Sequence, residues 1–277
     1  MQRTISNNDM NDLAQGPPVL DDITRKFLME AFKVLRQRDA IVITGSCVVA
    51  LTLENRNLPS FLPADIDVFV KQNLQLDGEI FDRYFLYFHI LVPLWTKGIH
   101  TQPRDIAVKA SNFKKYSNCK INILQIMEIA LCQDGEDVAI NRPKIQLIVV
   151  ADDSSIPQEL PLLYLTPFER KVVTSFDIDI VQGAYNPNSG LIKFAYNDTK
   201  QNILEMQFWY ICDPDRPNRL SSALERIKKY TDRTFTFKGF RDINQPHLAI
   251  FLTKYRLSEP QSFLLDTDSN KGQNGLH

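Results

Sequence analysis

The sequence predicts a mixed α/β (α+β) protein in which helices flank a mixed β-sheet. Two short apolar runs rich in β-branched residues, at 40–43 and 145–150, indicate buried strands. From Asp21 onwards, apolar residues recur every three or four positions, which is the spacing of an amphipathic helix. Strand-like and helical segments follow one another along the chain, so we expect the sheet and the helices to share a core.

Composition limits the class of protein. The 277 residues are 44% hydrophobic and 23% charged, which supplies enough apolar material for a sizeable core. A net charge of −1 gives no overall attraction to nucleic acids or membranes. No apolar run reaches the roughly 18 residues that cross a bilayer, and residues 1–16 do not resemble a secretory signal peptide. Four widely spaced cysteines favour reduced thiols, so we expect an intracellular, cytoplasmic location without a membrane partner.

The chain is expected to divide into four regions. Polar composition predicts flexibility at both ends, and a turn-forming cluster near 213–217 separates a core from a C-terminal region. That C-terminal region should be α-rich and basic, with its main helix at 220–230, and should pack on the core. The predicted regions are 1–20 (flexible), 21–198 (core), 199–265 (C-terminal) and 266–277 (flexible tail).

Charge is concentrated in the C-terminal region. Ten Lys and Arg residues and three Asp and Glu residues lie between Arg216 and Arg256, which gives this segment a net charge of +7. One interpretation is a solvated basic surface. The other is a contact with a polyanion, either a triphosphate or a nucleic-acid backbone.

The first stretch with chemical content follows the strand at 40–43. Thr44-Gly45-Ser46 leads directly into an apolar helix at 47–53. Gly45 would let a ligand approach the backbone, and the free N–H groups of the helix N-terminus would face an anion. This arrangement is typical of a phosphate-binding turn, although many purely structural strand–helix turns also carry glycine.

The second stretch is a strand at 65–70 in which Asp65 and Asp67 alternate with Ile66 and Val68. Two carboxylates on one face of a strand repel each other near a core unless a cation lies between them. Mg²⁺ prefers such oxygen ligands. The alternative is an exposed strand end with two solvated acids.

The third stretch repeats this pattern later in the chain. A helix begins at Thr166 with a capping box completed by Glu169. Asp177 and Asp179 then alternate with isoleucines in a predicted strand at 176–182. A turn at 186–190 returns the chain as a further strand at 191–196, which predicts a hairpin.

Together the three stretches resemble the nucleotidyltransferase fold of the DNA polymerase β superfamily. The family pattern is an apolar strand with Gly-(Gly/Ser), then (Asp/Glu)-x-(Asp/Glu), then a third acid. The chain is most similar to a branch found in large DNA viruses and some fungi. In that branch the late strand reads Phe-Asp-x-Asp, as at 176–179, and a later Arg-Ile-x-Lys-Tyr-x-x-Arg-x-Phe motif matches 226–235. The sequence departs from the pattern at Thr44, before Gly45, and at Thr234, where the branch often has glycine.

The resemblance implies a metal-dependent nucleotidyltransferase that moves a nucleoside monophosphate from an NTP to a hydroxyl acceptor. The metal would be Mg²⁺ or Mn²⁺, held by Asp65, Asp67 and Asp177, with Asp179 as the alternative third acid. Other residues would bind the triphosphate. The acceptor stays open between a protein hydroxyl, a small molecule and a nucleic-acid end. The residues implied in triphosphate binding are Gly45, Ser46, Lys228, Lys229 and Arg233.

Two other functions remain compatible with the sequence. A catalytically inactive member of the fold could serve as a structural or binding protein, for instance in a viral particle, because fold does not secure activity. The basic segment at 216–256 could instead bind nucleic acid, although it lacks the aromatic–basic interleaving of a recognised RNA-binding module.

Overall fold

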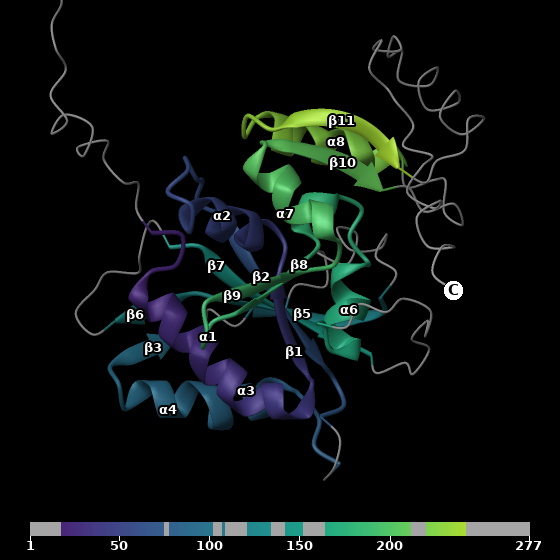
Figure 1. Cartoon of the computed structure of the whole chain (residues 1–277). Helices are drawn as coiled ribbons and strands as arrows, with labels where there is room; N and C mark the ends of the chain where they lie inside the picture. Colours follow the sequence, from purple (N-terminus) through teal and green to yellow (C-terminus); the bar gives the residue numbers. More distant parts are fainter. Residues whose placement is uncertain are drawn as a thin grey trace, which may run out of the picture.

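The structure is a computed structural model that describes residues 18–74, 78–101, 107–108, 121–133, 142–151, 164–211 and 220–241. Within these residues a seven-stranded mixed sheet is flanked by helices, which confirms the predicted fold class (Figure 1). The strand order is β4-β5-β7-β2-β1-β8-β9. The strands are β1 (Ile41–Thr44), β2 (Asp65–Lys71), β4 (Ala107–Val108), β5 (Ile123–Ile129), β7 (Lys144–Val150), β8 (Gly183–Asn186) and β9 (Leu191–Phe194).

Two smaller two-stranded sheets and a set of helices complete the described part of the chain. The small sheets pair β3 (Ile99–Thr101) with β6 (Leu131–Gln133), and β10 (Gln207–Ile211) with β11 (Thr236–Arg241). No helix in the described ranges is long and apolar enough to cross a membrane. The helices are α1 (Asp22–Leu35), α2 (Ser46–Glu54), α3 (Arg83–Leu86), α4 (Val92–Trp95), α6 (Pro167–Val173), α7 (Asn197–Leu204) and α8 (Leu220–Thr231), with short 3-10 turns η1 (Arg36–Arg38) and η5 (Asp179–Val181) and a π-helical turn η2 (Tyr87–Leu91).

The two faces of the large sheet are covered by different helices. Alternate side chains point to opposite faces of a strand, so Ile41 and Ile43 pack with α1 while Val42 packs with α6. Asp21 caps α1 as predicted, by accepting a hydrogen bond from the Thr24 amide at 2.8 Å. Val19 and Leu20, the last residues of the predicted flexible N-terminus, are buried against the core, which corrects that boundary. The predicted flexibility of 1–17 and of the tail at 266–277 lies outside the described residues.

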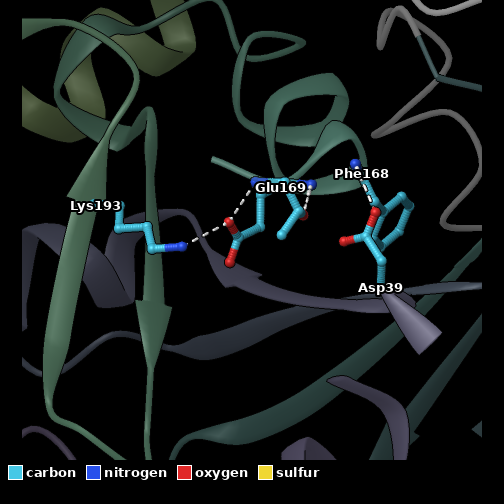
Figure 2. Close-up of polar contacts among 5 residues, drawn as sticks. Asp39, Phe168, Glu169 and Lys193 are labelled. Atoms are coloured by element: carbon cyan, nitrogen blue, oxygen red, sulfur yellow. Dashed lines mark hydrogen bonds and ion pairs between the residues drawn. The ribbon is translucent and has the colours of Figure 1, made fainter. Parts of the chain in front are cut away.

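Helix α6 is fixed to the sheet by polar contacts at its first turn (Figure 2). The predicted capping box is present: Thr166 accepts from the Glu169 amide, and Glu169 accepts from the Thr166 amide. Lys193 of β9 reaches Glu169 at 3.2 Å. The carboxylate of Asp39 accepts from the Phe168 amide at 3.4 Å. The N–H groups that begin α6 are therefore satisfied within the protein.

The register of the central strands brings the first two chemical stretches together. β1 runs antiparallel to β2, and Thr44 pairs with Asp67, so the end of β1 lies beside the start of β2. On its other side β2 runs parallel to β7. The turn that follows β1 is therefore next to the two carboxylates of β2. The predicted strands at 40–43, 65–70, 145–150 and 191–196 appear at 41–44, 65–71, 144–150 and 191–194.

The predicted strand at 176–182 is wrong. Ile178 makes a single bridge with Tyr210, residues Asp179–Val181 form η5, and β8 begins only at Gly183. The predicted alternation assumed a strand with one buried and one exposed face. Here Asp177 and Asp179 are buried, and so are the isoleucines between and after them. Both carboxylates accept hydrogen bonds from the C-terminal part of the chain, and these bonds replace a regular strand ladder.

The C-terminal region contains a sheet as well as helices. β10 and β11 are parallel and are joined through α8, and we call 207–211 with 220–241 the β-α-β unit. The predicted helix at 220–230 is present as α8. Figure 1 shows the unit at the end of the molecule where α2 and α7 also lie. Its core side chains pack on Val49 and Leu53 of α2, and these side chains are Phe208, Tyr210, Ala223, Tyr230, Phe235 and Phe240.

Candidate functional site

The turn between β1 and α2 is shaped around the carboxylate of Asp67. Gly45 has φ +82° and ψ −150°, a conformation that is essentially restricted to glycine. A Cβ atom at this position would lie 2.6 Å from Oδ2 of Asp67. Ser46 is buried and begins α2. The backbone of the predicted phosphate-binding turn and the predicted metal ligand Asp67 are therefore in direct contact.

Thr44, where the sequence departs from the family pattern, has a role in the fold. Its side chain is fully buried, and its hydroxyl donates to the Val181 carbonyl at 3.2 Å. This bond ties the end of β1 to η5, which begins two residues after Asp177. The departure therefore links two parts of the candidate site.

Asp65 and Asp67 occupy the same side of β2, as predicted. Both are half-buried, whereas Ile66 and Val68 are fully buried on the other side. Burial raises the pKa of the neighbouring Cys47 thiol well above its ordinary range, and the negative charge of Asp67 adds to that effect. Cys47 is therefore a neutral thiol beneath the turn and does not supply a thiolate.

One side of the α8 segment faces these carboxylates with two arginines and a tyrosine. Arg226 and Tyr230 are four residues apart, which places them on one side of α8, and Arg233 follows three residues later in the turn after the helix. The Tyr230 hydroxyl is buried, and this burial raises its pKa. The arginines lower that pKa, whereas Asp67 and Asp177 raise it further. Four charged groups of the candidate site therefore act on one buried phenol.

Arg233 is held in place by aromatic side chains. Its guanidinium carbon lies 3.9 Å from the ring centroid of Phe61 and 5.3 Å from that of Tyr230. Partial burial lowers its pKa, and Tyr230 and Asp65 oppose that shift. Its Nη1 atom is buried without a hydrogen-bond partner. Arg233, which was predicted to bind triphosphate, therefore brings a positive charge close to Asp65.

The predicted third acid, Asp177, accepts hydrogen bonds from two side chains of the β-α-β unit. The Tyr210 hydroxyl donates to Oδ2 at 2.8 Å, and Arg226 forms an ion pair with Oδ1 through Nη1. Only 7% of the Asp177 side chain is exposed. Arg226 and Tyr210 were not singled out from the sequence, although Arg226 opens the late motif and shares the spacing of Tyr230 and Arg233.

The alternative third acid, Asp179, is fully buried in the same network. Its carboxylate accepts from the Trp209 amide at 2.8 Å and from the Asn202 side chain at 2.7 Å. Burial raises its pKa to about 6, and the two hydrogen bonds and the charge of Arg241 partly offset that shift. Asp179 therefore joins η5 to α7 and β10.

The two lysines that were predicted to bind triphosphate lie elsewhere on α8. Lys228 and Lys229 are both exposed, whereas Tyr230 is buried and Arg226 is half-buried. The structure thus brings Gly45, Ser46, Asp65, Asp67 and Arg233 towards one region and leaves the lysines at the outer surface of the helix. Much of the predicted basic segment, at 216–219 and 242–256, lies outside the described residues.

Asp65 and Asp67 suit a divalent cation better than Asp177 does. Asp65 and Asp67 provide two half-buried carboxylates from one strand face, which is the oxygen chemistry that Mg²⁺ and Mn²⁺ prefer. At Asp177 a guanidinium already neutralises the carboxylate. Over the ranges that the structure describes, no three His, Cys, Asp or Glu side chains form a group that could hold a metal ion.

The fold and the site define a mixed α/β protein with carboxylates and guanidinium groups gathered at one end of its large sheet. No protein-family model matches the chain, and no curated protein shows significant sequence similarity to it.

Proposed function

We propose that the protein is a divalent-metal-dependent nucleotidyltransferase that transfers a nucleoside monophosphate from an NTP to a hydroxyl acceptor, with release of pyrophosphate and the hydroxyl proton. The observation that carries the proposal is the contact between the Asp67 carboxylate and the Gly45 turn, beside the arginine-bearing side of α8. A metal–NTP complex needs carboxylate oxygens for the cation and backbone or guanidinium N–H groups for the phosphates. Both kinds of group are present at this end of the sheet.

Each group has a distinct task in this proposal. Asp65 and Asp67 would hold Mg²⁺ or Mn²⁺, which when bound neutralises phosphate charge and lowers the pKa of an acceptor hydroxyl. The Gly45 backbone and the first N–H groups of α2, from Ser46, would bind the β- and γ-phosphates. Arg233, whose Nη1 is buried without a partner, would bind the triphosphate from the side of α8.

The test is transfer of the α-phosphate. The full chain is incubated with Mg²⁺ or Mn²⁺ and each of the four NTPs, labelled at either the α- or the γ-phosphate, together with separate protein, RNA and small-molecule acceptors. We expect label to move from the α-labelled NTP only, and the labelled fraction identifies the acceptor class. Asp67→Asn should abolish transfer, and Asp22→Asn, which changes an exposed carboxylate of α1, should not. Absence of transfer with every donor, metal and acceptor refutes the proposal.

A second candidate is favoured by one specific observation. The Arg226–Asp177 ion pair places a guanidinium on the carboxylate that an active member of the resembled family would use for metal. This arrangement would suit an inactive nucleotidyltransferase-fold protein that binds a nucleotide or a partner. A chain that is stabilised against heat by an NTP with Mn²⁺, yet transfers no label, would support this candidate over the enzyme.

A further inference from the structure

We propose that Asp177 positions Arg226 for triphosphate binding and is not a metal ligand, so that Asp65 and Asp67 are the protein's carboxylate ligands. The inference rests on the proposed function for its substrate class, a nucleoside triphosphate. It differs from what the sequence resemblance implies, because that resemblance assigns Asp177 to the metal.

Among the described residues, Asp177 forms its hydrogen bonds with the β-α-β unit. Oδ1 is paired with Arg226 and Oδ2 accepts from the Tyr210 hydroxyl at 2.8 Å. The backbone carbonyl of Asp177 accepts from the Ile211 amide at 2.7 Å, and Ile178 bridges Tyr210. Two contacts thus orient the side chain away from a metal-ligand role, and two backbone contacts hold this part of the chain against the same unit.

A cation at Asp177 would also meet an electrostatic cost. The side chain is only 7% exposed, so charges around it are weakly screened. A divalent ion bound there would share the carboxylate with the guanidinium of Arg226, and the two positive charges would repel each other. Breaking the ion pair to admit the metal would lose the attraction between Arg226 and a carboxylate that is itself largely buried.

Arg226 is well placed to act on a ligand while Asp177 holds it. Its side chain is 30% exposed, so it reaches solvent even though its partner does not. The helix that carries it is fixed, because Ala223 and Tyr230 are buried in the cluster that joins α8 to α2. A guanidinium has five N–H donors in a planar fork, and pairing through Nη1 fixes the direction of that fork. Asp177 therefore selects one orientation of Arg226.

Arg233 extends the same surface beyond the last turn of α8. It is positioned by the Phe61 ring and not by Asp177. The two guanidinium groups flank Tyr230, and both are close enough to influence its pKa. Two rigidly held arginines match a polyphosphate, whose oxygens accept paired N–H donors.

The experiment measures metal binding and triphosphate binding separately on the full chain. Mn²⁺ affinity is measured by electron paramagnetic resonance without nucleotide. Affinities for a fluorescent non-hydrolysable NTP analogue and for the matching nucleoside are measured by anisotropy. The variants are Asp177→Asn, Arg226→Gln, Arg226→Lys, the Asp177→Asn/Arg226→Gln double variant and Asp65→Asn/Asp67→Asn. Lys238→Gln, an exposed cation on β11, is the matched control.

We expect Asp177→Asn to leave Mn²⁺ affinity within about twofold and Asp65→Asn/Asp67→Asn to lower it by at least about tenfold, because only the latter removes proposed ligands. Asp177→Asn and Arg226→Gln should each weaken binding of the analogue by about tenfold, the order expected for one charge-assisted contact. The double variant should be no weaker than Arg226→Gln, because both changes act through one contact. Arg226→Lys should retain part of the affinity, and nucleoside binding and Lys238→Gln should match the wild type.

Three results would overturn the inference. The first is a loss of Mn²⁺ affinity in Asp177→Asn as large as in Asp65→Asn/Asp67→Asn, with no loss in Arg226→Gln. The second is a double variant whose loss of analogue affinity equals the product of the single losses. The third is a wild type that binds no analogue. If Arg226→Gln does not fold, Arg226→Lys compared with Asp177→Asn/Arg226→Lys decides the coupling. A chain that binds Mn²⁺ and analogue as expected but transfers no label contradicts the proposed function alone.

Discussion

Replacing Gly45 by alanine tests the geometry on which the candidate site depends. The new Cβ atom would lie 2.6 Å from Oδ2 of Asp67, a distance that forces one of the two to move. The backbone at Gly45 also has a conformation that an alanine rarely adopts. The substitution therefore adds a backbone cost and a side-chain contact at the same point.

The two costs can be estimated separately. A non-glycine residue in this backbone region costs about 1–3 kcal/mol. Moving the Asp67 side chain off its preferred rotamer costs about 0.5–1.5 kcal/mol more. We therefore expect Gly45→Ala to lower the free energy of unfolding by about 1.5–4.5 kcal/mol and to displace the Asp67 carboxylate.

Urea unfolding of the wild type and four variants separates these contributions. Gly190→Ala is the matched control, because Gly190 also has positive φ (+68°) but a Cβ atom there would meet nothing within 4 Å. Its cost should be only about 1–2 kcal/mol, the penalty for a left-handed alanine. The loss of stability caused by Gly45→Ala is also measured in the Asp67→Ala background. There it should be smaller than in the wild type by the cost of the contact between the new Cβ atom and the Asp67 carboxylate. A Gly45→Ala protein that is as stable as the wild type and binds Mn²⁺ equally well would refute the reasoning.

Two further outcomes are expected. Burial raises the pKa of Asp179 from its ordinary value of 3.8 to about 6, so between about pH 4 and pH 6 the folded state binds more protons than the unfolded state and loses stability as the pH rises. Urea unfolding should show this loss in the wild type but not in Asp179→Asn. Parallel pH profiles of the two proteins would contradict the assignment. Arg233→Gln should weaken triphosphate binding by about tenfold. Lys228→Gln/Lys229→Gln should weaken it less, because both lysines are exposed. Titration of a fluorescent NTP analogue measures both effects, and a larger loss in the lysine variant would restore the lysines as the triphosphate ligands.

The elements that the sequence predicts well are those whose signal is local. The strand at 41–44 and the capping box of Thr166 are encoded by adjacent residues, and both are present. The alternation around Asp65 and Asp67 is likewise local, and it places both acids on one side of β2. Such patterns depend on residues that are adjacent in the chain, so they can be recognised without knowledge of the rest of the fold.

The elements that the sequence did not predict depend on contacts between distant residues. Asp177 accepts hydrogen bonds from residues 33 and 49 positions later, so nothing near Asp177 in the sequence indicates its partners. β10 and β11 pair in parallel across α8, and no short turn marks that pairing. The strand-like alternation at 177–180 was misleading because all four of its residues are buried.

The large separation in sequence between the acidic and the basic parts of the site has a consequence for synthesis of the chain. Arg226 lies 159 positions after Asp67, so at translation rates of about 5–20 residues per second the carboxylates leave the ribosome roughly 10–30 s before their counter-charges. During that interval neither Arg226 nor Arg233 has been added to the chain. The late arrival of α8 therefore completes a site whose carboxylates and glycine turn are synthesised first.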